Sequence, residues 1–155
     1  YYASRGLGDV YKRQITIIIL SLVMNKAVLS ISSEVGNIIK VENFIESFSE
    51  TFSLPPDLFG KISLSIIEAV NNAILSGNKL DASKQVCLEA WEENNKFHVS
   101  IEDEGQGFDY NHIPDPTLPD NILKDAGRGL YIMKTLSDEL IFEKNGAKVT
   151  LIFDL

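Results

Sequence analysis

The sequence has a single cysteine, Cys87, so the chain cannot form an internal disulfide. We therefore expect a protein of the reducing cytoplasm. Basic residues are also few, since 14 Lys and Arg stand against 22 Asp and Glu, for a formal net charge of −8. Because nucleic acid and anionic lipid are bound by basic surfaces, we expect neither nucleic acid nor a membrane among the partners.

A long hydrophobic run is missing near the N-terminus, where residues 15–24 (ITIIILSLVM) are apolar but too short for a membrane span of roughly 20 residues. Lys12 and Arg13 precede this run as in a signal peptide, but no small-residue cleavage site follows it. The residues before it resemble translated adaptor sequence. We expect residues 1–23 to be non-native or upstream translated sequence, with targeting as the alternative, and residues 24–155 to form one domain.

A chain that begins at Met24 should therefore melt at the same temperature as the full chain. Thermal unfolding of the two chains checks this expectation. A fall of several degrees in Tm on truncation would mean that the apolar run packs on the domain.

Hydrophobic periodicity predicts an alternation of strands and helices from residue 26 onward. Together they predict an α/β two-layer sandwich, a mixed and mostly antiparallel sheet covered on one face by helices. The predicted strands are 26–33, 84–92, 96–102 and a closing hairpin that turns at Asn145-Gly146, and the predicted helices are 34–52, 58–77 (with Asp57 as its cap) and 129–139.

The predicted helix 58–77 is apolar except for one narrow polar stripe. Its members are three or four residues apart and share one line of a helix: Lys61, Ser65, Glu68, Asn72 and Ser76. An ordinary solvated face would explain the stripe as well as a polar site does. Glu68 and Asn72 nevertheless offer a carboxylate base and a hard oxygen ligand for magnesium.

The predicted strand 96–102 ends in an acidic, glycine-containing stretch, VSIEDEGQGFDY at 99–110. Asp103 follows the strand directly, and Gly105 and Gly107 come next. A second glycine pair, Gly127 and Gly129, flanks Arg128 at a predicted helix start. A helix N-terminus has unpaired N–H groups, and glycines let phosphate oxygens approach them.

Together the stretches EAVNNA (68–73), EDEGQGF (102–108) and GRGLYIM (127–133) resemble the N, G1 and G2 boxes of the GHKL, or histidine kinase-like, ATPases. The resemblance runs from about residue 24 to residue 155. It implies the Bergerat ATP-binding fold, with ATP and Mg²⁺ as cofactors. It also implies that the long loop at about 109–126 is the ATP lid.

The roles of individual residues follow from this resemblance. Asp103 would accept a hydrogen bond from the adenine amino group, while Gly105 and Gly107 would let the backbone turn under the base and ribose. Glu68 would be the general base and Asn72 the magnesium ligand.

The phosphates would lie at the second glycine pair. Gly127 and Gly129 would let them approach the backbone, and we expect Arg128 to add a charge-assisted contact.

Among the branches of this family, the chain resembles the bacterial anti-sigma factor serine/threonine-protein kinases. Its two histidines, His98 and His112, both lie within the expected ATP domain, unlike the phospho-accepting histidine of a histidine kinase. The resemblance implies a kinase that phosphorylates a serine of a small anti-anti-sigma protein and sequesters a sigma factor, with room for a homodimer.

Two alternatives stay open. One is a nucleotide-binding regulatory module with little phosphotransfer, and the other is the detached catalytic domain of a two-component histidine kinase. The sequence also departs from the family pattern, because Ser76 stands where many relatives have histidine, and Ala147-Lys148 where they often have threonine.

Overall fold

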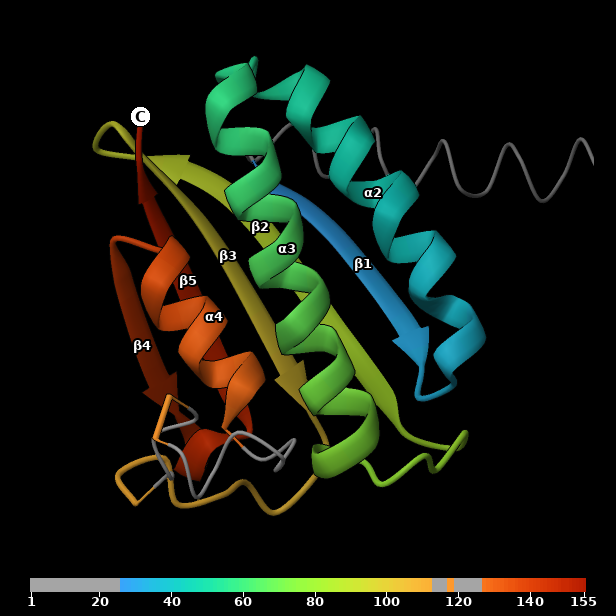
Figure 1. Ribbon diagram of the computed structural model, residues 1–155. Helices are drawn as coiled ribbons and strands as arrows, with labels where there is room; N and C mark the ends of the chain where they lie inside the picture. Colours follow the sequence, from blue (N-terminus) through green and yellow to red (C-terminus); the bar gives the residue numbers. More distant parts are fainter. Residues whose placement is uncertain (1–25, 113–116, 119–126) are drawn as a thin grey trace, which may run out of the picture.

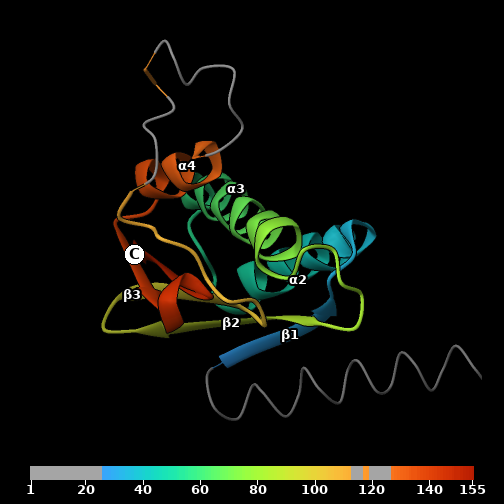
Figure 2. The same ribbon diagram turned by 90° about the horizontal axis from the view of Figure 1, so that it is seen from below.

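The computed structural model describes residues 26–112, 117–118 and 127–155. Within these ranges five strands form one sheet in the order β1-β2-β3-β5-β4, and every pairing is antiparallel. All helices of this part lie on one face of the sheet, which gives two layers (Figure 1 and Figure 2). The expected two-layer sandwich is confirmed, and the described sheet is antiparallel throughout rather than mixed. The expected segment 1–23 and most of the expected lid lie outside the described residues.

The elements follow the predicted order. The strands are β1 (Lys26–Ser32), β2 (Gln85–Glu93), β3 (Lys96–Asp103), β4 (Glu139–Glu143) and β5 (Lys148–Asp154). The helices are α2 (Ile38–Thr51), α3 (Pro56–Asn72) and α4 (Arg128–Leu136), with a 3-10 turn at Val35–Asn37 and a π-helical turn at Ala73–Gly77.

The core lies between the sheet and the helices, and α3 is the middle helix of the layer (Figure 1). Ile62, Ile66 and Val70 of α3 are fully buried, as are Phe97 and Val99 of β3. Within the described residues, Pro56–Gly77 alone is long and apolar enough to cross a membrane by length and composition. Here its apolar character is explained by its central place in the core.

Two predictions about helix starts are wrong. Asp57 does not cap α3, because the helix already begins at Pro56 and Pro55 occupies the N-cap without a side-chain bond. Asp57 lies instead in the first turn, where its charge is favourable toward the helix dipole. The predicted helix 34–52 begins with the 3-10 turn Val35–Asn37, and the α-helix itself begins only at Ile38.

The predicted helix 129–139 ends earlier, at Leu136. The Ser137 side chain donates to the Met133 carbonyl, and the Asp138 N–H donates to the Ile152 carbonyl, so the chain already joins the sheet at Asp138. The closing hairpin then turns at Asn145 and Gly146, both with positive φ, as predicted.

The face of the sheet opposite the helices carries an aromatic pair. Trp91 of β2 and His98 of β3 are paired across the strands, and their rings stack with centroids 5.0 Å apart and an interplanar angle of 11°. The Lys26 ammonium lies 5.0 Å from the Trp91 ring centre and 3.7 Å from a Glu89 carboxylate oxygen. We call Lys26, Trp91 and His98 the open-face cluster.

Candidate functional site

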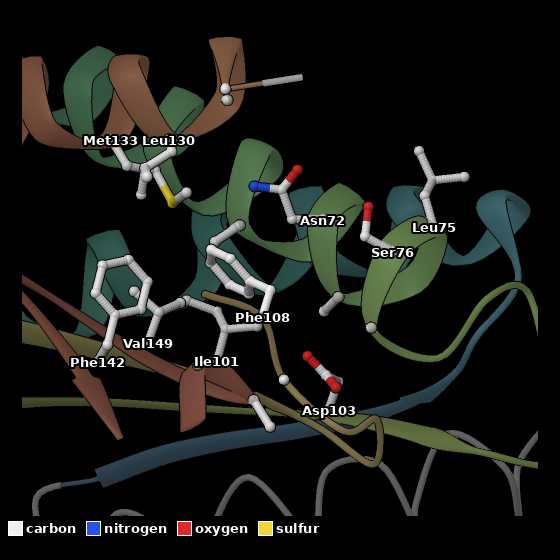
Figure 3. Close-up of a pocket in the computed structure, with 18 of the residues that line it drawn as sticks. Asn72, Leu75, Ser76, Ile101, Asp103, Phe108, Leu130, Met133, Phe142 and Val149 are labelled. Atoms are coloured by element: carbon white, nitrogen blue, oxygen red, sulfur yellow. The ribbon is translucent and has the colours of Figure 1, made fainter. Parts of the chain in front are cut away.

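A pocket of about 570 Å³ opens between the helix layer and the sheet, at the end where β3 stops (Figure 3). This volume suits a small organic ligand, for which pockets of roughly 300–1,000 Å³ are typical. Asn72 and Ser76 line the pocket from the α3 side, and Asp103 lines it from the sheet (Figure 3). The apolar walls come from α4, the strands and the loop after β3: Leu130, Met133, Ile101, Val149, Phe142 and Phe108.

Asp103 is held rigidly at the end of β3. Its N–H donates to the Ala147 carbonyl at 2.9 Å, and its Oδ1 accepts the Gly105 N–H at 2.8 Å. No described residue bonds its second carboxylate oxygen, which is therefore available to a ligand in the pocket. Burial raises the pKa of Asp103, while the Gly105 N–H opposes that rise.

Two glycines allow α3 and β3 to meet beside this carboxylate. A methyl group on Gly77 would lie 2.4 Å from the Asp103 carboxyl carbon, and one on Gly105 would lie 2.3 Å from the Gly77 carbonyl oxygen. Both distances are far below van der Waals contact. Gly105 does not line the pocket itself, and its N–H instead orients the Asp103 side chain.

Gly107 lines the pocket where the loop after β3 crosses the β4–β5 hairpin. Its φ is +76°, and a methyl group there would lie 2.1 Å from the Asn145 carbonyl oxygen. The next residue, Phe108, donates its N–H to the same carbonyl at 2.9 Å. Glycine is therefore required at position 107 for two reasons: its φ lies in the left-handed region, and the loop and the hairpin approach each other closely there.

Gly107→Ala should lower both Tm and ligand affinity, because the new methyl group forces the loop away from the hairpin. A shift of about 2–4 °C is expected for each kcal/mol lost in a domain of this size. Gly60→Ala in α3 is the matched control, since nothing lies within 4 Å of its added methyl group and Ala favours a helix. An equal or higher Tm for Gly107→Ala would contradict this account of the loop.

The other end of the pocket is formed by the start of α4. Gly127 precedes this helix with φ +89°, and Gly127 and Gly129 both line the pocket. A methyl group on Gly129 would lie 2.9 Å from Glu68 Oε2 and 3.2 Å from Asn72 Nδ2. The N–H groups that begin α4 thus lie next to the two polar side chains that the sequence singled out.

The structure separates the predicted site residues into two groups. Those that line the pocket are Asn72, Asp103, Gly107, Gly127 and Gly129. Glu68 is half-buried beside Gly129, and Arg128 is the exposed first residue of α4; neither side chain is part of the described pocket wall.

The polar stripe on α3 does not share one environment. Ser65 is fully buried and Lys61 is exposed, whereas Ser76 is exposed at the pocket edge. Ser65 is buried because α3 lies between α2 and α4, so little of its surface faces solvent (Figure 1). The stripe is therefore not one polar surface: Asn72 and Ser76 line the pocket, and Glu68 lies beside Gly129.

An aromatic wall closes the sheet side of the pocket and was not predicted. The Phe108 and Phe142 rings lie 5.8 Å apart edge to face, and Tyr110 stacks on Phe142 at 4.5 Å. Sequence reasoning also missed Gly77, which was expected only to end a helix. Its close contact with Asp103 joins residues far apart in sequence, so no local pattern could have indicated it.

Comparison with known proteins decides the family. The profile of the histidine kinase-like ATPase domain matches residues 31–153. The chain belongs to the histidine kinase-like ATPase family. The predicted resemblance is thereby confirmed, and the pocket lies where its three sequence boxes meet.

Relatives of this histidine kinase-like ATPase include anti-sigma factors. An anti-sigma F factor of Geobacillus stearothermophilus is 32% identical over 101 residues, which cover 63% of this chain and 68% of the relative. One from Clostridium perfringens strain SM101 is 30% identical over 118 residues, 73% of this chain and 81% of the relative. The serine-protein kinase RsbW of Bacillus subtilis is 29% identical over 87 residues, 51% of this chain and 53% of that protein. Within the family, the chain belongs with the anti-sigma factor serine kinases.

A solved structure has the same fold. The crystal structure of the RsbU and RsbW domains of Rv1364c from Mycobacterium tuberculosis matches with a TM-score of 0.60 and 15% sequence identity. The match covers 84% of this chain and 32% of that one, so this histidine kinase-like ATPase spans about a third of the matched protein.

Proposed function

We propose that this protein binds ATP with magnesium in the pocket and transfers the γ-phosphate to a serine of a small anti-anti-sigma protein. The observation that carries the proposal is the polarity of the pocket. A rigid carboxylate, Asp103, stands at the sheet end, and the start of α4 stands with Glu68 and Asn72 at the other. This arrangement supports a ligand with a base at one end and phosphates at the other.

The base end is suited to adenine. The unbonded carboxylate oxygen of Asp103 accepts a hydrogen bond from the exocyclic amino group of adenine. Apolar side chains near Asp103, such as Ile101 and Val149, pack against the adenine ring. Ala147, which stands where relatives often have threonine, is buried and lines the same wall. Asp103 is thus the polar group that selects an amino-bearing base.

The phosphate end uses the backbone and the two polar side chains. Gly127 and Gly129 let phosphate oxygens approach the N–H groups that begin α4, and Arg128 adds positive charge at the same turn. Glu68 takes the proton of the serine hydroxyl as the serine oxygen forms a bond to the γ-phosphorus. The bond to the β–γ bridging oxygen breaks, and ADP leaves.

A magnesium ion fits this end of the pocket. The described residues contain no group of three or more His, Cys, Asp or Glu that could hold a metal alone. Magnesium usually takes one or two protein oxygens and completes its shell with phosphates and water, so the Asn72 amide oxygen with a nucleotide suffices. When bound, it would neutralise the charge that develops on the phosphates.

The names of the relatives support the proposed partners. Because the relatives are named anti-sigma F factor and serine-protein kinase, we infer that this chain also sequesters a sigma factor. We further propose that it acts in the cytoplasm and can form a homodimer. Residues of about 109–126 serve as the lid over the bound nucleotide. Residues 24–155 form the functional domain.

The test is phosphotransfer to a defined partner. The full chain is incubated with γ-labelled ATP, Mg²⁺ and an anti-anti-sigma protein encoded beside it, and phosphoserine is sought in that protein. Label should appear on serine and disappear when the acceptor serine is replaced by alanine. Tight ADP binding without transfer would favour the regulatory module, and label on a histidine would favour the two-component reading.

A further inference from the structure

We infer that Gly77 and Asn78, the Gly77–Asn78 corner, form a positioning element that sets the selectivity of the pocket for an amino-bearing base. The inference rests on the proposed role of Asp103 and adds to it. Gly77 and Asn78 do not bind the ligand's amino group themselves. They fix the backbone and side chain of the residue that does.

Asn78 is almost completely buried, at 1% exposure, and its side chain joins three segments of the chain. Its Nδ2 donates to Ser33 Oγ at 2.6 Å, just after β1, and to the Gln85 carbonyl at 2.8 Å, where β2 begins. Its Oδ1 accepts the N–H of Glu104 at 2.8 Å, directly after Asp103. Both ends of the amide are therefore used.

These bonds complete a frame around Asp103. Three successive N–H groups are tied: Asp103 to Ala147, Glu104 to Asn78, and Gly105 to the Asp103 carboxylate. The Glu104 carboxylate also accepts a hydrogen bond from the Gln85 N–H. Because Asn78 links this frame to β1 and β2, the backbone on either side of the Asp103 carboxylate is fixed to the sheet.

The π-helical turn delivers Asn78 to this position. The Asn78 N–H donates to the Ala73 carbonyl five residues earlier at 2.8 Å, one residue more than in an α-helix. The wider turn brings Gly77 against the Asp103 carboxyl group and places the Asn78 side chain inside the protein. Widened turns of this kind often occur at functional sites.

The chemistry of the corner allows few other residues. An aspartate at 78 would retain the acceptor for Glu104 but would face the Gln85 carbonyl with a second acceptor. Alanine at 78 would leave the Glu104 N–H unpaired and would remove the hydrogen bonds that join this turn to Ser33 and Gln85. At 77, φ is not in the left-handed region, so alanine is allowed by the backbone and is excluded only by contact with Asp103.

Gly77→Ala is consequently the sharper test. It favours the helical turn, so the fold should be retained, while the methyl group must displace the Asp103 carboxylate. We measure by calorimetry the affinities for ADP and for inosine diphosphate, which carries an oxygen in place of the adenine amino group. The parent should prefer ADP, and Gly77→Ala and Asn78→Ala should each lower that preference by about tenfold or more.

Ile45→Val is the matched control, because it weakens the buried core of α2 without touching the corner. It should lower Tm and keep the parent's preference for ADP. If the parent itself binds both nucleotides equally, the role of Asp103 fails. If the parent prefers ADP and both corner variants keep the full preference, the inference about the corner is overturned while Asp103 retains its role.

Discussion

Glu68→Gln should lower the rate of serine phosphorylation by about 10²–10⁴-fold, because a positioned general base contributes that much. Glutamine keeps the size and the hydrogen bonding of the side chain but cannot take a proton. Glu68 lies beside the start of α4 and outside the pocket wall, so ADP affinity should change little. A single-turnover assay with saturating partner protein measures the rate, and calorimetry measures the affinity.

Two further variants make the result specific. Glu93→Gln removes the same charge from the exposed far end of the sheet and should leave the rate unchanged. Asn72→Ala should weaken both the magnesium–nucleotide complex and phosphotransfer, since Asn72 lines the pocket. A Glu68→Gln protein as fast as the parent would remove Glu68 from the role of base.

Asp103→Asn should weaken ADP binding by about tenfold or more, because a hydrogen bond to a charged acceptor contributes roughly 1.5–3 kcal/mol. The variant keeps an oxygen for the Gly105 N–H, so the loop after β3 should retain its shape. The same variant should raise the Tm of the nucleotide-free protein slightly, since it removes a charge that folding takes out of water. Unchanged ADP affinity would contradict the role of Asp103 in base recognition.

The raised pKa of Asp103 predicts how stability and ADP affinity change with pH. Burial raises the pKa of Asp103 above the usual aspartate value of 3.8, so the folded protein binds this proton more tightly than the unfolded chain does. The stability cost of its charge is present at neutral pH and is relieved as pH falls through the raised pKa. The Tm advantage of Asp103→Asn should therefore shrink on acidification. The parent's ADP affinity should fall in the same range, which lies above that of an exposed aspartate, as the acceptor is protonated.

The sequence predicted those features whose causes are local. Alternating apolar residues predicted strands β2 and β3, and the apolar repeat of residues 58–77 predicted the helix that forms α3. Glu68 and Asn72 were predicted as site residues because helical spacing places them one turn apart. Asp103 and its following glycines were found because an acidic, glycine-rich stretch is unusual at the end of a core strand.

The missing features depend on contacts between distant segments. Nothing near Asn78 indicates that its amide meets Ser33, Gln85 and Glu104, which are up to 45 residues away. The π-helical turn adds one residue to a hydrogen-bonded ring, a change too small for hydrophobic periodicity to register. The burial of Ser65 follows from the helices on either side of α3, which a single-helix pattern does not contain.

The open-face cluster gives the molecule a built-in optical probe. Trp91 is the only tryptophan in the chain, and it is stacked on His98 across the sheet from the pocket. Its fluorescence emission should change little when nucleotide enters the pocket. It should change when a protein covers the outer face of the sheet. One spectrometer channel can thus separate protein docking from nucleotide binding without any label.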